Sequence, residues 1–176
     1  MTGRSRESLT LDHSVIDGSA SFTVAARVKI GDPSKPMVVA RQGTSGNDTW
    51  RIEYRPVDAS TSQWIFARTA ATSSTETATA VSVDRSTVTD WHLISATYAV
   101  APGGTVNPRL DIAVDLFDRS VHPFPATPTR AGATTIGSSR TQTTPFVGRL
   151  DDLRLYAGVA AEPFLCTTYL DPNNCG

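Results

Sequence analysis

Apolar and polar residues alternate along the segment 22–30. One parity carries Phe22, Val24, Ala26, Val28 and Ile30, and the other carries Thr23, Ala25, Arg27 and Lys29. Because successive side chains of a strand point to opposite faces, this period of two places the first set on one side. The pattern predicts a strand with one face in a core and the other toward solvent.

Shorter runs with the same period recur along the rest of the chain. Trp50, Ile52 and Tyr54 alternate with polar residues, and Trp64 and Phe66 share one parity of the next run. Segments 50–55 and 63–68 are therefore predicted to pair in a hairpin. Further strands are predicted at 37–40, 91–100, 110–117, 134–137 and 146–156, with a weak strand inside the polar stretch 70–89. The apolar residues of these strands that are expected to line one core with Phe22, Val24 and Val28 are Leu93, Ile112, Val114, Leu153 and Leu155.

Glycine and proline separate these runs, and no segment repeats its apolar residues at helical spacing. About ten short strands divided by turn residues indicate an all-β fold, either a sandwich or a jelly roll. The length of 176 residues is enough for one domain with its own core.

Charge narrows the range of partners. The formal net charge is -1, and the basic residues are nearly all arginine, with only two lysines. Nucleic acids and anionic membranes are bound by clusters of Lys and Arg, so neither is expected as a partner. No apolar stretch approaches the roughly 18 residues of a membrane span, and the N-terminus lacks the apolar run of a secretory signal.

Three segments carry a family resemblance. The run GSASFTVAARVKI resembles the SFTVSAWVKL strand of laminin G-like domains, and TDWHLISATYAV resembles their TWTHLAGVYD strand. The segment FVGRLDDLRLYAGVAAEPF resembles their closing FPGSIDEVRIYDRALSAEEI, and the three matches follow the family's order across Ser8 to Phe164. The resemblance implies a two-sheet antiparallel jelly-roll sandwich of the concanavalin A-like kind.

The same resemblance divides the chain. It implies a laminin G-like domain over residues 1–160 and a C-terminal extension over 161–176. Two departures from the family pattern are visible. The usual LYVNGK hairpin is replaced by IAVDLFDRS, with Asp115 after the valine, so a remodelled turn is expected there. The first loop is also short, which puts any ligand site built from that loop in doubt.

The two cysteines lie close together in LCTTYLDPNNC. The proline and asparagines between them favour a turn, so a Cys166–Cys175 disulfide is predicted, closing a small loop. Two free thiols in a reducing compartment are the alternative. No second cysteine pair or nearby histidine completes a tetrahedral metal site.

Catalytic residues of the glucanases with this architecture are absent. Those enzymes carry Glu-x-Asp-x-Glu on one strand, whereas the nearest pattern here is Asp111, Ala113 and Asp115. Residues four apart on a strand are separated by about 13 Å. Glycosidase carboxylates lie about 5–9.5 Å apart. The three histidines are scattered along the chain and form no recognisable catalytic motif. Because neither the carboxylates nor the histidines form a catalytic set, no enzyme activity is expected.

Asp151 is the candidate metal ligand. It shares strand parity with Leu153 and Leu155, so it is expected to point inward, where an uncompensated carboxylate is too costly. The resemblance implies a structural Ca²⁺ at the equivalent acid, with Asp12 or Asp17 contributing oxygen ligands. An arginine or backbone amides would satisfy Asp151 without metal.

Aromatic side chains on a solvent-facing sheet can stack on sugar rings. Trp50 and Tyr54 are the candidates for such a platform, although Ile52 on the same face favours a core role for both equally well. Trp64, Phe66 and Trp91 fall where the family has structural aromatics.

The predicted function is a non-catalytic binding, adhesion or structural module on an exterior surface, extracellular, cellular or viral. Its expected partner is a glycan or a protein surface. A bacteriophage virion component, as a minor tail or capsid decoration protein contacting other chains of the particle, is the alternative. A glycan hydrolase or lyase is the third hypothesis.

Overall fold

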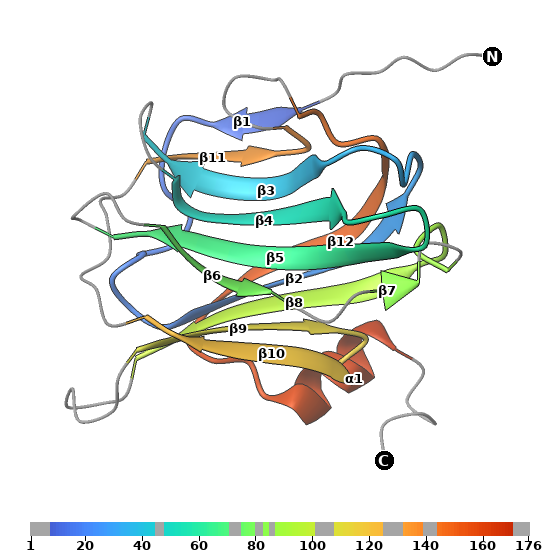
Figure 1. Ribbon diagram of the computed structural model, residues 1–176. Coiled ribbons are helices and arrows are strands. Elements are labelled where there is room, and N and C mark those ends of the chain that lie inside the picture. The colour runs from blue at the N-terminus through green and yellow to red at the C-terminus, as the bar shows by residue number, and fades with distance from the viewer. Residues whose placement is uncertain are drawn as a thin grey trace.

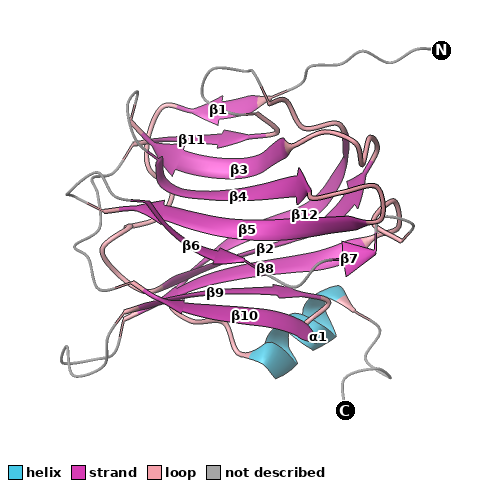
Figure 2. Ribbon diagram, viewed as in Figure 1, coloured by secondary structure: helices cyan, strands magenta, loops and turns pink. Residues whose placement is uncertain are grey.

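Two antiparallel sheets pack face to face in the computed structural model (Figure 1). It describes residues 8–44, 48–70, 75–79, 83–84, 87–100, 108–124, 132–138 and 144–170. The strand-rich sandwich is clear when the chain is coloured by secondary structure (Figure 2). The predicted all-β jelly-roll class is confirmed. Among the described residues, no helix is long and apolar enough to cross a membrane.

One sheet has seven strands and the other has five. The seven-stranded sheet runs β1-β11-β3-β4-β5-β6, with β7 also pairing to β5. Its strands are Leu9–Leu11 (β1), Ala133–Ile136 (β11), Met37–Gly43 (β3), Asp48–Pro56 (β4), Thr61–Thr69 (β5), Thr75–Thr79 (β6) and Val83–Asp84 (β7). The five-stranded sheet runs β10-β9-β8-β2-β12. Its strands are Asp118–Pro123 (β10), Arg109–Val114 (β9), His92–Ala99 (β8), Phe22–Ile30 (β2) and Gly148–Ala157 (β12).

The core between the sheets is aromatic at its centre. The Phe22 ring lies 6.0 Å from Trp50, 6.1 Å from Phe66 and 5.8 Å from Tyr98, measured between centroids. The parity predicted from sequence is confirmed here, because the apolar residues of β2 and β9 that were expected inside are buried in this cluster. They are Phe22, Val24, Val28, Ile112 and Val114.

A second apolar cluster lies on the outer face of the five-stranded sheet. The helix α1, Glu162–Tyr169, packs there, and Leu165 and Tyr169 bury Ala25 and Leu93. This helix was not predicted from the sequence, and Leu93 was expected in the main core. Leu93 is buried on the opposite face instead, because both faces of this sheet are covered. Cys166 lies in α1. Its expected partner, Cys175, lies outside the described residues, so the Cys166–Cys175 disulfide stays a prediction.

A β-bulge in β12 reverses the predicted orientation of Asp151. Asp151 pairs with Arg27 of β2, but the next pair joins Arg154 to Ala25, so the register shifts by one residue. Asp152 takes the extra position with a left-handed φ of 50°. Asp151 is therefore exposed, while Leu153 and Leu155 pack against the core as partly buried residues. The inward orientation predicted for Asp151 is wrong.

The turn between β9 and β10 is remodelled, as the sequence indicated. Asp115 and Leu116 have φ values of 51° and 67°, so the strand ends at Val114 rather than continuing to Phe117. Left-handed backbone costs roughly 1–2 kcal/mol at a residue with a side chain. The Asp115 carboxylate offsets that cost, because it accepts a hydrogen bond from the backbone N–H of Leu93 at 2.8 Å.

Candidate ligand-binding face

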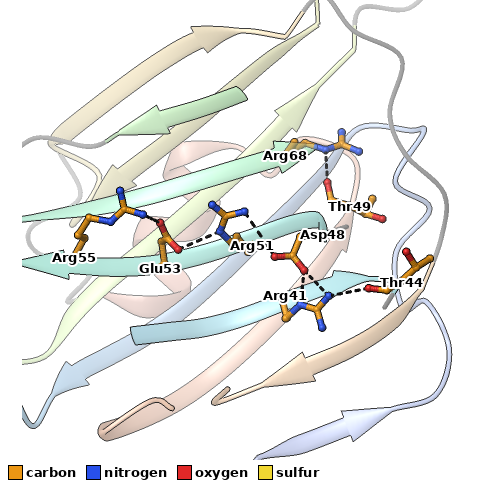
Figure 3. Close-up of polar contacts among 8 residues, drawn as sticks. All are labelled: Arg41, Thr44, Asp48, Thr49, Arg51, Glu53, Arg55 and Arg68. Carbon is orange, nitrogen blue, oxygen red and sulfur yellow. Dashed lines mark hydrogen bonds and ion pairs between the residues drawn. The ribbon is translucent and has the colours of Figure 1, made fainter. Parts of the chain in front are cut away.

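The outward face of the seven-stranded sheet carries a line of alternating charges. Trp50, Ile52 and Tyr54 of β4 point into the core, so the residues between them point outward. The outward set on β4 and the neighbouring β3 is called the arginine row below (Figure 3). It consists of Arg41, Asp48, Arg51, Glu53 and Arg55.

Each carboxylate of the arginine row contacts two arginines. Asp48 accepts a hydrogen bond from Nε of Arg41 at 2.5 Å and lies 3.7 Å from NH1 of Arg51. Glu53 accepts from Nε of Arg51 at 3.1 Å and also pairs with Arg55. Arg41 is anchored further by a bond to the carbonyl of Thr44 at 3.4 Å. The row is thus one connected network that holds its guanidinium groups in place.

Solvent access rises along the row. The side chain of Arg41 is 4% exposed, that of Arg51 is 23% exposed, and that of Arg55 is 53% exposed. The facing positions on β5 are Ala67, Ile65 and Gln63, opposite Arg51, Glu53 and Arg55 respectively. Ala67 and Ile65 are buried. Ala67 and Ile65 therefore offer almost no surface to a ligand, and the accessible groups of this face are the charged side chains toward Arg51 and Arg55.

Trp50 and Tyr54 do not form a sugar platform. Both side chains are completely buried, and the Tyr54 hydroxyl donates to the carbonyl of Pro33 at 3.0 Å. The Tyr54 ring meets Trp64 at a centroid distance of 5.5 Å. The ligand role predicted for this pair is wrong, because Ile52 shares their face and that face is the core. The alternative that the sequence left open is the correct one.

The three candidate calcium ligands each have a separate local environment. Asp12 contacts its neighbour His13 at 3.0 Å, and this hydrogen bond lowers the pKa of the carboxyl. Asp17 accepts from the hydroxyl and backbone N–H of Ser19, which lowers its pKa. Among the described residues, no three His, Cys, Asp or Glu side chains are grouped as metal ligands. With Asp151 exposed, the reason for expecting calcium there is lost, and the metal stays a prediction.

The two carboxylates that most resembled a catalytic pair have different partners. Asp111 on β9 is buried and accepts two hydrogen bonds from Nε of Arg119, each at 2.9 Å. Asp115 bonds His92 Nδ1 at 2.7 Å in the turn that follows. Each carboxylate therefore compensates a basic group close to it.

Arg68 is a buried cation that the sequence analysis overlooked. Its side chain is completely buried, and its guanidinium lies 3.9 Å from the Tyr98 ring centroid. It donates to the carbonyl of Thr49 at 3.1 Å (Figure 3). It also donates to the carbonyl of Gly18 at 2.6 Å. Burial lowers its pKa to about 10. Parity could have revealed it, because residue 68 shares the inward face of Trp64 and Phe66.

Comparisons with known proteins agree with this architecture. A family model, Laminin_G_3, described as the concanavalin A-like lectin/glucanases superfamily, matches residues 3–162. No curated protein sequence is similar enough to count as a match. The resemblance to laminin G-like domains found in the sequence is confirmed.

Solved structures share the fold at low sequence identity. The CBM40 domain of the Ruminococcus gnavus IT-sialidase bound to α2,3-sialyllactose is 12% identical, with a TM-score of 0.63, over 94% of this chain and 97% of that one. Domains LG4-5 of the mouse laminin α1 chain are 16% identical, with a TM-score of 0.57, over 85% and 40%. The binding domain of botulinum neurotoxin DC in complex with SialylT is 9% identical, with a TM-score of 0.64, over 96% and 39%.

Proposed function

We propose, on the premise that this chain belongs to the concanavalin A-like lectin/glucanases superfamily, that it is a non-catalytic glycan-binding module. Its ligand is a glycan with a carboxylate-bearing sugar, held on the outward face of the seven-stranded sheet. The observation that carries the proposal is the arginine row, a connected charge network that is partly open to solvent.

The chemistry of the row suits an acidic sugar. Three arginines against two carboxylates give it a formal charge of +1. Arginine binds carboxylates through two parallel N–H donors, and Arg51 and Arg55 are the accessible members that would do so. Asp48 and Glu53 fix the guanidinium planes and offer acceptors to sugar hydroxyls. A preorganised network of this kind loses little conformational entropy when a ligand binds.

Two of the structural relatives support the choice of ligand. The Ruminococcus gnavus domain was solved with α2,3-sialyllactose and the neurotoxin domain with SialylT. Sialyllactose is also a practical probe, because lactose is the same molecule without the acidic sugar.

The experiment is a calorimetric titration of the protein with 3′-sialyllactose and with lactose. We expect sialyllactose to bind and lactose to bind at least tenfold more weakly. Arg51→Ala and Arg55→Ala should each weaken sialyllactose binding about tenfold, which corresponds to about 1.4 kcal/mol. The matched control is Arg149→Ala, an exposed arginine on β12 of the other sheet, which should bind as the wild type does. Equal binding of both sugars, or no effect of the row variants, would refute the proposal.

The role in a bacteriophage particle and the exterior location both stay predictions. A virion component would assemble with other chains, so a regular oligomer in solution, measured by light scattering, would favour that alternative.

A further inference from the structure

A groove lies beside the start of α1, on the outer face of the five-stranded sheet. Its volume is about 160 Å³, smaller than the roughly 300–1,000 Å³ of sites for drug-sized ligands. Its floor is hollow because β8 and β9 carry small residues there, which are Ser95, Thr97, Ala99 and Ala113. The start of α1 and the segment before it form the wall. The space therefore suits one small chemical unit rather than a chain of them.

The charges inside the groove cancel. Asp111 and Arg119 form an ion pair in the groove, and Asp111 is buried. Arg109 and Glu162 complete the charged lining, and Glu162 lies close enough to Arg119 to help raise the pKa of that guanidinium. Two positive and two negative groups leave no net attraction for an anion or a cation.

Both hydrogen-bond donors and acceptors face the same space. The N-terminus of α1 has no side-chain cap, because Ala161 occupies that position and cannot accept a bond from the helix. Arg109 and the unused N–H groups of Arg119 are further donors, and Glu162 supplies carboxylate oxygens. Leu116, Val159 and Leu165 add apolar surface to the lining. A ligand that fits must carry hydroxyl or amide groups on one side and C–H groups on another.

We propose that this groove binds one uncharged sugar residue. Its size, its balanced charge, and its mixture of donors, acceptors and apolar contacts all match the hydroxyl edges and C–H faces of a pyranose. The groove lies on the opposite sheet from the arginine row and takes a ligand of different charge. The inference therefore does not depend on the function proposed for that row.

The test is an NMR titration of the full chain with neutral monosaccharide probes. Methyl glycosides of glucose, galactose, mannose and N-acetylglucosamine are each added to millimolar concentration, and backbone amide shifts are followed. We expect at least one glycoside to give saturable shifts at residues 95–99, 109–119 and 159–165. Shifts of the amides on β3 and β4 would report on the arginine row instead, so the two proposals fail separately.

Two variants block the groove by different routes. Ala113→Leu fills the floor from β9, and Val159→Trp obstructs the rim from an exposed position. Each should abolish the saturable shifts, while the control Arg149→Ala, at an exposed residue outside the groove, should retain them. Retention of the shifts in both blocking variants, or no saturable shift with any of the four probes, would overturn the proposal. Tighter binding of N-acetylalanine methylamide at the same amides would also overturn it, because the groove would then be a peptide site.

Discussion

At the scale of single residues, Arg68 is the unusual feature of the core. The partners of Arg68 among the described residues include no carboxylate, and a cation without one is costly to bury. Its environment compensates by other means, since two backbone carbonyls accept its protons and three aromatic rings, those of Phe22, Tyr98 and Phe124, lie within 5.3 Å of its guanidinium carbon. The carbonyl of Gly18 belongs to the segment before β2, so Arg68 also ties that segment to β5.

Removing the Arg68 side chain should therefore destabilise the protein strongly. Arg68→Ala leaves a cavity among the rings and two carbonyls without their donor, and we expect a loss of about 3–5 kcal/mol in the free energy of unfolding. Arg68→Met keeps most of the volume, so its loss should be smaller. Urea denaturation measures both, with Arg149→Ala as the exposed control. A loss under about 1 kcal/mol for Arg68→Ala would show that the guanidinium is not held as described.

At the scale of elements, the β9–β10 turn depends on a hydrogen-bonded histidine. His92 Nδ1 bonds the carboxylate of Asp115 at 2.7 Å, and Nε2 lies 3.0 Å from the carbonyl of Thr87. The hydrogen bond that His92 donates to the Asp115 carboxylate is the main cause that raises the pKa of His92 above its ordinary value. When it is protonated, His92 thus stabilises a turn whose backbone is left-handed at Asp115 and Leu116.

This raised pKa predicts a pH dependence of stability. A group whose folded pKa exceeds its unfolded value, about 6.5 for histidine, binds a proton more tightly in the native state. Its contribution is complete below that unfolded pKa and is lost as pH rises through the higher folded pKa. The free energy of unfolding should therefore fall over this range. Asp115→Asn should flatten the fall, whereas His13→Gln, at an exposed histidine, should retain it. Urea denaturation at several pH values measures the free energy of unfolding of each variant. An equal fall with pH in Asp115→Asn and in the wild type would show that the His92–Asp115 hydrogen bond is not the cause.

At the scale of the whole molecule, the two faces of the sandwich differ. The seven-stranded sheet presents the arginine row, while the five-stranded sheet is partly covered by α1. Leu165 and Tyr169 hold this helix against the sheet, and the helix also carries Cys166.

The predicted Cys166–Cys175 disulfide would act on the unfolded chain as a whole. Closing a loop of about ten residues removes conformations from the unfolded ensemble and should stabilise the native state by about 2–3 kcal/mol. We expect Cys166→Ser and Cys175→Ser to lower the free energy of unfolding by similar amounts, and the double variant to lower it no further. Mass spectrometry without reductant checks the bond itself, and two freely alkylated cysteines in natively prepared protein would rule it out.

The sequence alone determined the class of fold and most of its strands. A period of two in segments such as 22–30 identifies both the strand and the residues that share a face, because that period follows from backbone geometry. The family motifs then placed these strands in one sandwich. The same period of two also places the charged residues of β4 on the outward face and Arg68 on the inward face, although the sequence analysis predicted a role for neither.

Only the tertiary structure decided which faces are covered and where the alternation breaks. Parity assigns residues to two faces but does not say whether one or both are buried, so Leu93 was placed on the wrong side and α1 was missed. A bulge shifts parity through one residue with left-handed φ, and the sequence LDDLRLY gives no local sign of it. Asp151 is therefore exposed, because the bulge in β12 changes the face on which its side chain lies. Trp50 and Tyr54 are buried, because the second sheet covers the face that they share with Ile52.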